Sequence, residues 1–317
     1  SKYKFKKTTH VYFPIDTNYL TNKFIKYWNP QIALFIESEV WPNMFKNLKI
    51  NKIPIILLNG RITKKSFKRW IKFPDFAKKN FSKISLAMPQ NIETSKYLKK
   101  LGVKKIKIAG NIKYFGKSIN LIDKNTKNFF KNRLIFCAAS THYNEELFIG
   151  KIHKQLKLKF KNLLTIIIPR HINRSSSIID NLHDIGLKII TRSSKQKINK
   201  NTDIYIADTY GESSKFYGLS NVTFVGGSLV QHGGQNPLEP ARIGNYILHG
   251  PNIQNFKEIY NMLKKLNISS KVNDVLNMKK IVNKKIKYKQ PLKVSQKLNL
   301  MGINILKKNL NEINKYI

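Results

Sequence analysis

The most informative chemistry lies in one glycine-rich stretch, VTFVGGSLVQHGGQNPLEPARIGNYILHGP, at residues 222–251. A β-rich run leads into a Gly-Gly pair, a loop with a second Gly-Gly pair, and a short helix that opens at Asn236 and Pro237. Proline suits the first turn of a helix, because the N–H group that it lacks would have no partner there. A strand, a glycine loop and a helix N-terminus together expose backbone N–H groups and the positive end of a dipole. This stretch therefore predicts a phosphate-binding site.

Glu239 lies one turn inside that helix and places a carboxylate beside the expected anion site. The ribose of a sugar nucleotide would explain it, because two neighbouring hydroxyl groups can donate to both oxygens of one carboxylate. The alternative is an ordinary turn between a strand and a helix, with a solvated glutamate. The two Gly-Gly pairs and the NPLEP string bring the nucleotide site level with that alternative, and both interpretations stay open at this point.

The charge of the chain is its most unusual overall property. A formal net charge of +42 suggests an anionic partner such as nucleic acid or a membrane surface. Only seven of the 59 basic residues are arginine, and the lysines are spread along the chain among many Asn and Ile residues. The codon bias of an A+T-rich genome produces that mixture on any fold, and lysine commonly forms a solvated surface. We therefore expect a general attraction to anionic partners and no dedicated nucleic-acid site.

Length and cysteine content indicate the number of domains and the cellular compartment. The 317 residues suit two domains of about 100 to 200 residues each. The single cysteine, Cys137, lies in the apolar run LIFCAAS, cannot form an internal disulfide, and is expected to be buried and inert in a reducing cytoplasm. No apolar run reaches the roughly 18 to 20 residues that a membrane span needs.

Short apolar strands alternate with segments long enough for a helix, which is typical of parallel β-α-β units in an α/β fold. The alternation stops in a polar, Asn-rich stretch and then restarts. We therefore predict two domains, at residues 1–117 and 132–317, joined by a linker at 118–131. Strands are expected at residues 32–36, 53–60, 84–89 and 105–114, and then at 134–140, 163–171, 187–192, 204–211, 222–227 and 246–251. Helical patterns near 253–266 and 292–315 close the chain.

Ligands in open α/β sheets bind at the carboxyl ends of the strands. Polar residues collect at these ends in both halves, so two domains with facing strand ends would form a cleft suited to joining two substrates. The residues concerned are Glu37, Glu39, Asn59, Arg61, Asn111 and those at 140–142, 169–171, 208–212 and 226–239.

A set of strings in a fixed order carries a family resemblance. They are ESEVWPN (37–43), LNGRIT (58–63), AGNIKY (109–114), AASTHYNEE (138–146), IIIPRHINR (166–174), ADTYGE (207–212) and FVGGSLV…GGQNPLEPA…GP…NF. Each string alone is weakly specific, but the set spans most of the chain and is highly specific. Together they resemble the 3-deoxy-D-manno-octulosonic acid (Kdo) transferases, which move Kdo from CMP-Kdo onto a lipid A precursor in lipopolysaccharide biosynthesis.

The resemblance implies the GT-B glycosyltransferase fold, in which a C-terminal Rossmann-like domain holds the donor nucleotide and an N-terminal one holds the acceptor. It also implies an inverting reaction without a metal or other cofactor, by a peripheral protein at the cytoplasmic side of the inner membrane. The residues are compatible with this. CMP leaves as a phosphate, whose charge needs stabilising more than it needs protonating. The 226–236 loop and Arg170 can stabilise it, and the sequence has no HExxH string or clustered Asp, His and Cys ligands.

The resemblance assigns the donor contacts to the second half. Arg170 is expected to bind phosphate through its fork of donors, and Asn236 and Glu239 match the nucleotide-binding pair, with Glu239 on the ribose hydroxyls. The alternatives are a surface cation for Arg170, a helix cap for Asn236 and a helix-start residue for His142, whereas His232 is assigned no role. The expected donor set is Ser140, Thr141, His142, Pro169, Arg170, His171, Gly226, Gly227, Gly234, Asn236 and Glu239, in which the glycines let the backbone approach the donor.

In the first half, Glu37 and Glu39 flank a strand end that is expected to face the acceptor. A carboxylate there can orient or deprotonate the attacking hydroxyl, and the alternative is a structural glutamate before the next helix. Arg61 is expected on the acceptor side, near lipid phosphates or the donor carboxylate. The lysine-rich aromatic segment 64–73 suits an anionic membrane surface, with a plain amphipathic helix as the alternative.

The sequence departs from the family pattern at its beginning. Family members carry a glycine-rich turn followed by the glutamate regarded as the catalytic base, and no such string precedes Val11. We therefore expect an incomplete N-terminal sheet with exposed apolar strand edges. We also expect a chain that binds CMP or CMP-Kdo but transfers Kdo slowly or not at all. The competing interpretations are another GT-B transferase that uses a UDP-sugar, and a basic nucleic-acid-binding protein on a Rossmann-like scaffold.

Overall fold

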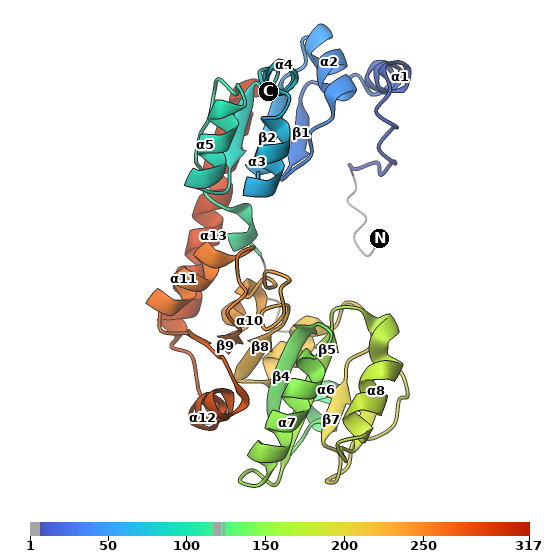
Figure 1. Cartoon of the computed structure of the whole chain (residues 1–317), viewed down its shortest axis with the longest axis vertical. Helices are drawn as coiled ribbons and strands as arrows, with labels where there is room; N and C mark the ends of the chain where they lie inside the picture. The colour runs from blue at the N-terminus through green and yellow to red at the C-terminus, as the bar shows by residue number, and fades with distance from the viewer. Residues whose placement is uncertain (1–6, 117–121, 123) are drawn as a thin grey trace. The chain divides into compact units, whose positions relative to one another are not determined.

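The computed structural model describes residues 7–116, 122 and 124–317, and it divides into two compact units (Figure 1). Unit 1 consists of Ser1–Phe115 and Met301–Ile317, and unit 2 consists of Gly116–Leu300. Each unit has a parallel β-sheet with helices packed on it, which confirms the predicted α/β class.

Unit 1 is built on three parallel strands in the order β1-β2-β3. Side chains at the helix starts explain where several helices begin. The side chains of Thr17, Thr63 and Asn91 each accept a hydrogen bond from the backbone N–H three residues later. The strands are β1 (Ala33–Ile36), β2 (Ile55–Gly60) and β3 (Leu86–Pro89), and the helices are α1 (Asn18–Trp28), α2 (Pro42–Ile50), α3 (Lys64–Trp70), α4 (Pro74–Phe81) and α5 (Ile92–Lys100).

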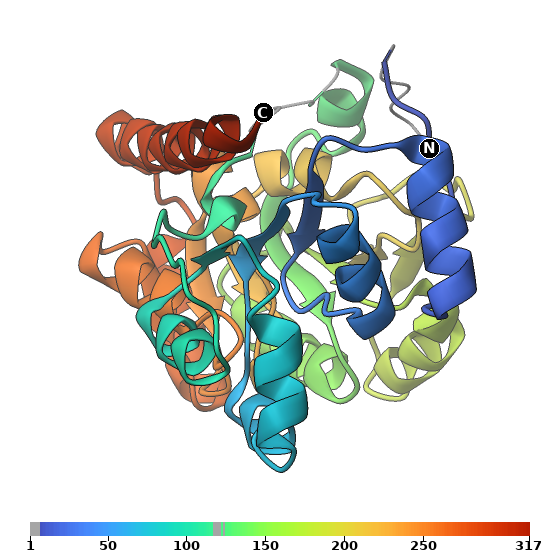
Figure 2. The same ribbon diagram turned by 90° about the horizontal axis from the view of Figure 1, so that it is seen from above.

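Helices cover both faces of the unit 1 sheet. One face packs against α1, α2 and α4, where Phe45 and Phe81 are fully buried. The two blue helices α1 and α2 lie side by side in Figure 2, and Asn47 Nδ2 donates to the Asn18 carbonyl at 2.9 Å. The other face packs against Ile313 near the C-terminus. Strand β1 forms the edge of the sheet and carries an exposed Ile36, as expected for an apolar strand edge.

One strand predicted for unit 1 is wrong. Residues 105–114 form a single bridge, between Ala87 and Ile106, followed by the short 3-10 helix η1 (Ile112–Tyr114). Gly110 has a φ of +100°, so the chain leaves the extended conformation soon after the bridge. The segment still reaches the carboxyl end of β2, because the Ile112 N–H donates to Asn59 Oδ1 at 3.1 Å.

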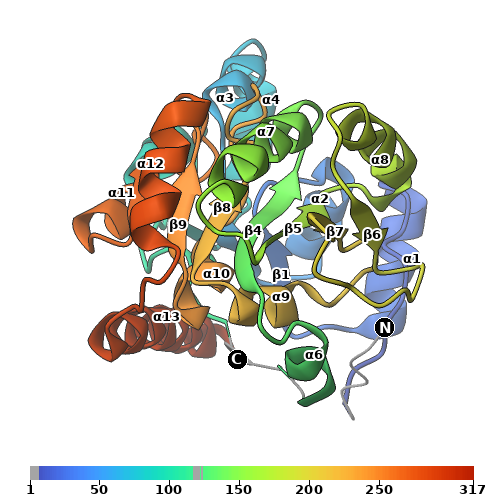
Figure 3. The ribbon, with the colours of Figure 1, turned by 90° about the horizontal axis from the view of Figure 1, so that it is seen from below.

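Unit 2 contains a seven-stranded parallel sheet in the order β10-β9-β8-β4-β5-β7-β6. The strands from β9 to β6 lie side by side in Figure 3. All six strands predicted for this half are present, and the short β10 was missed. The strands are β4 (Leu134–Thr141), β5 (Leu163–Pro169), β6 (Ile189–Thr191), β7 (Ile204–Ile206), β8 (Val222–Val225), β9 (Tyr246–His249) and β10 (Ser269–Lys271).

The unit 2 sheet is buried on both faces. Alternate residues of β4 enter different cores, with Phe136 on one face and Ile135 and Cys137 on the other. Burial raises the pKa of the Cys137 thiol to about 12, so this cysteine is inert, as expected. One face is covered by α7 (Glu145–Lys157), α8 (Ser175–His183) and α12 (Val275–Lys285), and the other by α6 (Lys124–Phe129) and α9 (Ser213–Leu219). The helices α10 (Leu238–Ile243) and α11 (Lys257–Lys265) follow β8 and β9.

The predicted domain boundaries need correction. The predicted linker at 118–131 lies partly outside the described residues, and its later part contains α6, whose Phe129 packs against the unit 2 core. The chain does not stay in the second unit to its end. Helix α13 (Leu292–Ile313) starts in unit 2, but residues 301–317 belong to unit 1, where the Tyr316 hydroxyl donates to the Ser85 carbonyl. Apolar periodicity predicted this helix but not the unit against which it packs.

The strand order of unit 2 fixes where a ligand would bind. From β4 the chain continues to β5 on one side, whereas β8, the other neighbour of β4, continues to β9 on the opposite side. The connections that leave the carboxyl ends of β4 and β8 therefore run in opposite directions, which makes this pair the switch point of the sheet, where open α/β sheets bind their ligands. Across the described ranges of both units, no helix is both long enough and apolar enough to cross a bilayer.

Candidate functional site

The carboxyl end of β4 brings three predicted motifs together. The register of β4 shifts at Ser140, which has a φ of +54°, a conformation that is uncommon outside glycine. On one side the Gly226 N–H donates to the Ala139 carbonyl at 2.8 Å, and on the other the Arg170 N–H donates to the Thr141 carbonyl at 3.0 Å. The 140–142, 169–171 and 226–227 segments therefore lie around a single strand end, as their positions after strands predicted.

Gly226 is required by a close internal contact. A Cβ atom at this position would lie 2.5 Å from the Ser140 carbonyl oxygen and 2.7 Å from Glu145 Oε2. Such distances are far below van der Waals contact, so any side chain would push β4 and β8 apart. We expected this glycine to let the backbone approach the donor, but the contact that requires it is with the protein itself.

The backbone N–H groups after β8 already have an anionic partner. Glu145, which is only 1% exposed, accepts hydrogen bonds from the N–H groups of Gly227 at 2.7 Å, Ser228 at 3.0 Å and Leu229 at 2.9 Å. Its Oε2 also accepts from the His142 N–H at 2.9 Å. Burial raises the pKa of Glu145, and the four N–H donors act in the opposite direction. The expectation that these amides hold a ligand phosphate is therefore wrong for residues 227–229.

A second glutamate fixes the loop after β5. Glu146 is buried and forms a two-pronged ion pair with Arg174, with both N–O distances at 3.1 Å. Arg174 also lies over the ring of Tyr143, 5.8 Å from its centroid. Because Arg174 ends the short helix η2 (Ile172–Arg174), this pair holds the segment that carries Arg170 and His171, both of which are exposed. The first turn of α7 thus positions two of the predicted donor-binding segments.

Three histidines gather at the same strand end. The ring of His142 lies 4.2 Å from that of His232 and 6.3 Å from that of His171, measured between ring centroids. Desolvation, helped by the proximity of His232, lowers the pKa of His142 to about 4. Its Nδ1 lies 3.0 Å from the Ser140 carbonyl oxygen. His142 is therefore neutral near pH 7 and cannot serve as a cation for a phosphate.

The later part of the glycine-rich stretch is held against its start. The Gly234 N–H donates to the Gly227 carbonyl at 2.7 Å, and Gly234 has a φ of +78°. The side chain of Asn236 caps the next helix, because its Oδ1 accepts from the Leu238 N–H at 3.1 Å. That helix, α10, has only six residues, so its dipole is weaker than the sequence suggested. Glu239 is an exposed residue in the first turn of α10. Desolvation raises the pKa of its carboxyl group, although the nearby Arg242 acts in the opposite direction.

The predicted acceptor-side residues lie at the strand ends of unit 1. Glu37 follows β1 with a φ of +62°, and its Oε1 forms an ion pair with Lys113 Nζ at 2.5 Å. Asn59, at the end of β2, has a φ of +52° and is 1% exposed, and its Nδ2 has no hydrogen-bond partner among the described residues. Non-glycine residues in this backbone conformation cluster at functional sites, because the surrounding fold must hold them there.

Glu39 and Arg61 lie next to Glu37. Glu39 is exposed, and its Oε2 accepts from Trp41 Nε1 at 2.7 Å. It lies beside an apolar hollow of about 470 Å³ along β1. The Arg61 N–H donates to the Glu37 carbonyl at 3.1 Å, and its own carbonyl accepts from the Ser38 hydroxyl. The structure thus brings all three predicted residues of this half to the ends of β1 and β2.

The match to known proteins agrees with the motifs. Residues 1–115 match the family described as 3-deoxy-D-manno-octulosonic-acid transferase (kdotransferase). The 3-deoxy-D-manno-octulosonic acid transferase of Haemophilus influenzae is 36% identical over 260 residues, which cover 80% of this chain and 61% of that protein. The protein of the same name from Rickettsia felis is 35% identical over 260 residues, which cover 80% of this chain and 55% of that protein. The chain belongs to the Kdo transferase family. It spans between 55% and 61% of the length of these two relatives.

Solved structures resemble both units of this Kdo transferase family member. The C-terminal CMP-Kdo binding domain of WaaA from Acinetobacter baumannii matches 56% of this chain and 91% of its own, with 29% identity and a TM-score of 0.48. UDP-GlcNAc 2-epimerase from Neisseria meningitidis matches 92% of this chain and 78% of its own, with 12% identity and a TM-score of 0.59. Trehalose 6-phosphate synthase from Burkholderia multivorans matches 92% of this chain and 70% of its own, with 11% identity and a TM-score of 0.54. The last two matches confirm the predicted GT-B fold class.

Sequence reasoning missed Glu145, the central residue of the site in this family member. The motif AASTHYNEE contains Glu145 but does not by itself indicate its partners. Its position was nevertheless informative, since a carboxylate that follows a strand at the switch point can reach the N–H groups after the neighbouring strand. His232 was also missed, because nothing in its sequence neighbourhood indicates a contact with His142.

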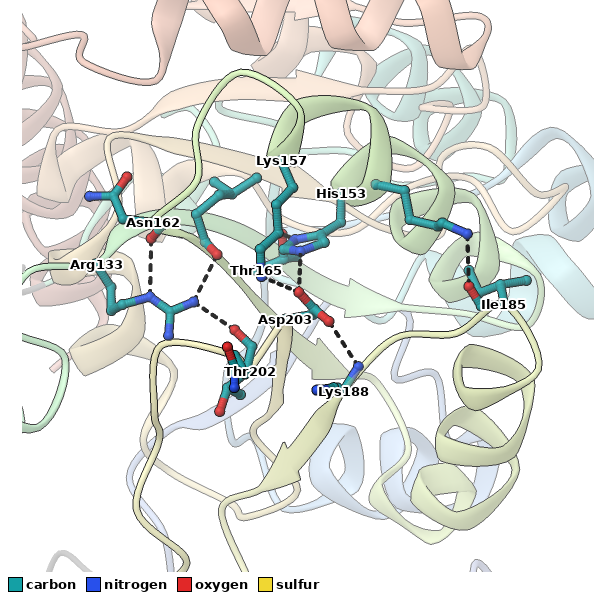
Figure 4. A network of polar contacts seen from close by, with 12 residues as sticks. Arg133, His153, Lys157, Asn162, Thr165, Ile185, Lys188, Thr202 and Asp203 are labelled. Carbon is teal, nitrogen blue, oxygen red and sulfur yellow. Dashed lines mark hydrogen bonds and ion pairs between the residues drawn. The ribbon is translucent and has the colours of Figure 1, made fainter.

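A buried polar network lies at the opposite end of the unit 2 strands from this site (Figure 4). Asp203, just before β7, accepts hydrogen bonds from the Lys188 N–H at 2.9 Å and from Lys157 Nζ, and its Oδ1 lies 3.3 Å from His153 Nε2. Burial acts to raise the pKa of Asp203, but these donors outweigh it and lower the pKa below its usual range. The network lies at the amino ends of the strands, away from the site. No cluster of three or more His, Cys, Asp or Glu suited to a metal occurs among the described residues.

Proposed function

We propose that this chain takes part in the transfer of Kdo from CMP-Kdo to a lipid A precursor, as an inverting transferase that needs no metal. One observation carries the proposal. The 140–142, 169–171 and 226–234 segments, which carry the family motifs, converge at the switch point of the unit 2 sheet through direct backbone hydrogen bonds. The curated relatives at 36% and 35% identity are named 3-deoxy-D-manno-octulosonic acid transferases, which supports Kdo as the transferred group.

Unit 2 would hold the donor at the ends of β4, β5 and β8. Because Glu145 takes the amides after β8, the main charge available to the departing phosphate is Arg170, whose exposed guanidinium offers a planar fork of donors. Glu239 would accept from the ribose hydroxyls. Its position in the first turn of α10, in a residue that is exposed, supports that role. Asn236 would contribute its amide nitrogen, since its oxygen already caps α10.

Unit 1 would hold the acceptor, with Glu37 or Glu39 at the attacking hydroxyl. In the reaction, the acceptor oxygen bonds to the anomeric carbon of Kdo, its proton passes to a carboxylate, and the bond from that carbon to the phosphate oxygen breaks. Lys113 keeps Glu37 paired, which suits an orienting role, whereas Glu39 is exposed and suits proton removal. Since we expect slow transfer by this chain, the rates of Kdo transfer by Glu37→Gln and Glu39→Gln, each relative to the rate of the parent, separate these two roles.

A basic and apolar surface on unit 1 supports a membrane-surface partner. The predicted segment 64–73 needs refinement, because Phe67 stacks on Tyr97 at 4.4 Å and Trp70 packs on Phe81 at 5.1 Å, within the unit. The exposed apolar residues are instead Ile71, Phe73 and Phe76, and exposed lysines lie on both sides of them in the chain. Aromatic side chains flanked by lysines suit the headgroup region of an anionic bilayer.

Nucleotide binding by the purified chain tests the donor assignment. We expect saturable binding of CMP in calorimetry, weaker binding of UDP, and a loss of about 10- to 100-fold for Glu239→Ala, because a hydrogen-bonded charge is removed. Glu93→Ala, an exposed glutamate in unit 1, is the matched control. Equal binding of UDP would favour a different sugar nucleotide. Steeply salt-dependent binding to nucleic acid, without a CMP site, would support the nucleic-acid alternative instead.

Vesicle flotation tests the membrane assignment separately. The chain should float with vesicles that contain anionic lipid, and the variant Phe73→Ser with Phe76→Ser should float much less. Leu158→Ser, which removes an exposed apolar side chain from unit 2, should float like the parent. If both variants behave alike, the Ile71, Phe73 and Phe76 surface does not contact the bilayer.

A further inference from the structure

The hydrogen-bond pattern of His142 fixes which nitrogen carries its proton. Nδ1 lies 3.0 Å from the Ser140 carbonyl oxygen, which can only accept, so Nδ1 carries the hydrogen. Glu145 Oε2, at 3.9 Å from the same nitrogen, favours the same tautomer. Because the pKa of His142 is lowered to about 4, the ring is neutral and Nε2 presents a lone pair.

That lone pair has no partner. His142 Nε2 is buried and accepts no hydrogen bond within the part of the chain that the structure describes, and the same holds for the hydroxyl of the neighbouring Thr141. The Thr141 side chain is completely buried. Buried polar atoms are almost always paired, and an unpaired one costs free energy. Two adjacent unpaired groups at the switch point therefore indicate a ligand that completes them.

We propose that an O–H or N–H group of the bound sugar nucleotide donates a hydrogen bond to His142 Nε2, and that the phosphate of this nucleotide does not bind there. The proposal rests on the proposed function of unit 2 and names the chemistry of one contact within it. A neutral imidazole with its lone pair directed outward accepts hydrogen bonds, and a phosphate oxygen offers it nothing to accept. The Glu145 carboxylate beside the ring further disfavours an anion at this position.

His232 would shield His142 Nε2 until the ligand binds. Its ring lies 4.2 Å from the ring of His142, and the residue itself is exposed in a turn. Gly227 leaves room for both rings, since a Cβ atom there would lie 3.1 Å from His142 Cε1 and 3.2 Å from His232 Nδ1. The exposed ring is the group that can turn away when the ligand arrives, whereas His142 is held by Ser140.

Paired substitutions at His142 test which ring nitrogen matters. The amide of Gln reaches the position of Nε2, and the shorter Asn reaches only that of Nδ1. We expect His142→Gln to bind donor ligands within about threefold of the parent and His142→Asn to bind about tenfold more weakly, the loss expected for one hydrogen bond. His183→Gln, at the exposed end of α8, controls for the change of residue type, and thermal unfolding confirms that each variant is folded.

Three ligands identify the group that donates to Nε2. If the loss for His142→Asn occurs with CMP and not with UMP, the cytosine amino group donates. A loss with both nucleotides assigns a ribose hydroxyl, and a loss only with CMP-Kdo assigns a hydroxyl of Kdo. All three results support the proposal, whereas equal affinities of the Gln and Asn variants for every ligand would overturn it. A parent chain that binds none of the ligands would overturn the proposed function and this inference together.

The pH dependence supplies a readout that a purely structural role would not give. The charged and titratable groups around His142 are Glu145, His171, His232 and Arg174, and the Gln variant retains all of them. If His142 stays neutral in the complex, the ratio of parent to His142→Gln affinity is constant between pH 5.5 and 8. A ratio that rises as the pH falls would mean that a protonated His142 binds an anion, and the proposal would fail.

Discussion

The carboxylate of Glu145 accepts a hydrogen bond from the backbone N–H of Gly227 at 2.7 Å, across a separation of 82 residues in the sequence. The N–H groups of Ser228 and Leu229 donate to the same carboxylate. A protein side chain thus occupies the place where the glycine-rich loop would otherwise bind an external anion. The bonds order the loop before any ligand arrives, so they link the first turn of α7 to the shape of the site.

Replacing Glu145 with Gln should destabilise the chain by about 1 to 3 kcal/mol, because the amide nitrogen of Gln would face a backbone N–H and leave it unpaired. The loss is measured as a lower urea midpoint. Glu93→Gln, on an exposed helix face, is the control and should change little. An unchanged midpoint for Glu145→Gln would contradict this contribution of the second carboxylate oxygen to stability.

Two glycine substitutions separate close contact from backbone strain. Gly226→Ala should cost about 3 kcal/mol or more, since its Cβ would lie 2.5 Å from the Ser140 carbonyl oxygen. Gly186→Ala has open space around its Cβ but a φ of +74°, so it should cost about 1 kcal/mol from strain alone. Denaturant unfolding of the two variants gives the comparison. Equal losses would contradict the contact at Gly226.

Asp203→Asn should reduce stability by about 3 kcal/mol, because it leaves His153 and Lys157 without their shared carboxylate in a buried setting. The affinity for CMP should not change, since the network lies at the strand ends opposite the site. Unfolding and calorimetry measure the two effects. Asp184→Asn, exposed at the end of α8, is the control. A parallel loss of CMP affinity in the folded variant would indicate coupling between the two ends of the strands.

Acid should destabilise unit 2 through Glu212. Hydrogen bonds from Arg192 at 3.1 and 3.3 Å lower the pKa of Glu212 from 4.5 to about 2. A carboxyl group whose pKa is lower in the folded state stabilises the folded state at pH values above its pKa in the unfolded state. The contribution of Glu212 is therefore present above pH 4.5 and is lost as the pH falls towards 2. After solvent screening we expect about 1 kcal/mol.

The difference in urea midpoint between pH 6 and pH 3 measures this contribution. It should shrink in Arg192→Gln and in Glu212→Gln, whereas Arg69→Gln, an exposed arginine of α3, should keep it. If Arg192→Gln shows the full difference, another carboxylate is responsible for the acid sensitivity.

The sequence alone predicted the α/β class, the family and ten strand positions, of which only residues 105–114 failed. These features follow from local signals. Runs such as 134–140 are apolar on both faces, which is typical of a buried parallel strand. The donor motifs also lie at the strand ends, because ligand positions in such sheets follow from strand direction.

Only the tertiary structure decided how the polar groups pair. Glu145 and the amides of Gly227, Ser228 and Leu229 are far apart in the sequence, and no local pattern indicates that they meet. The same holds for His142 with His232, for Glu37 with Lys113, and for the end of α13 with unit 1. The physical reason is that local patterns show on which strand or helix a side chain lies. Its partner depends on which distant segments pack together, and local patterns do not reveal that.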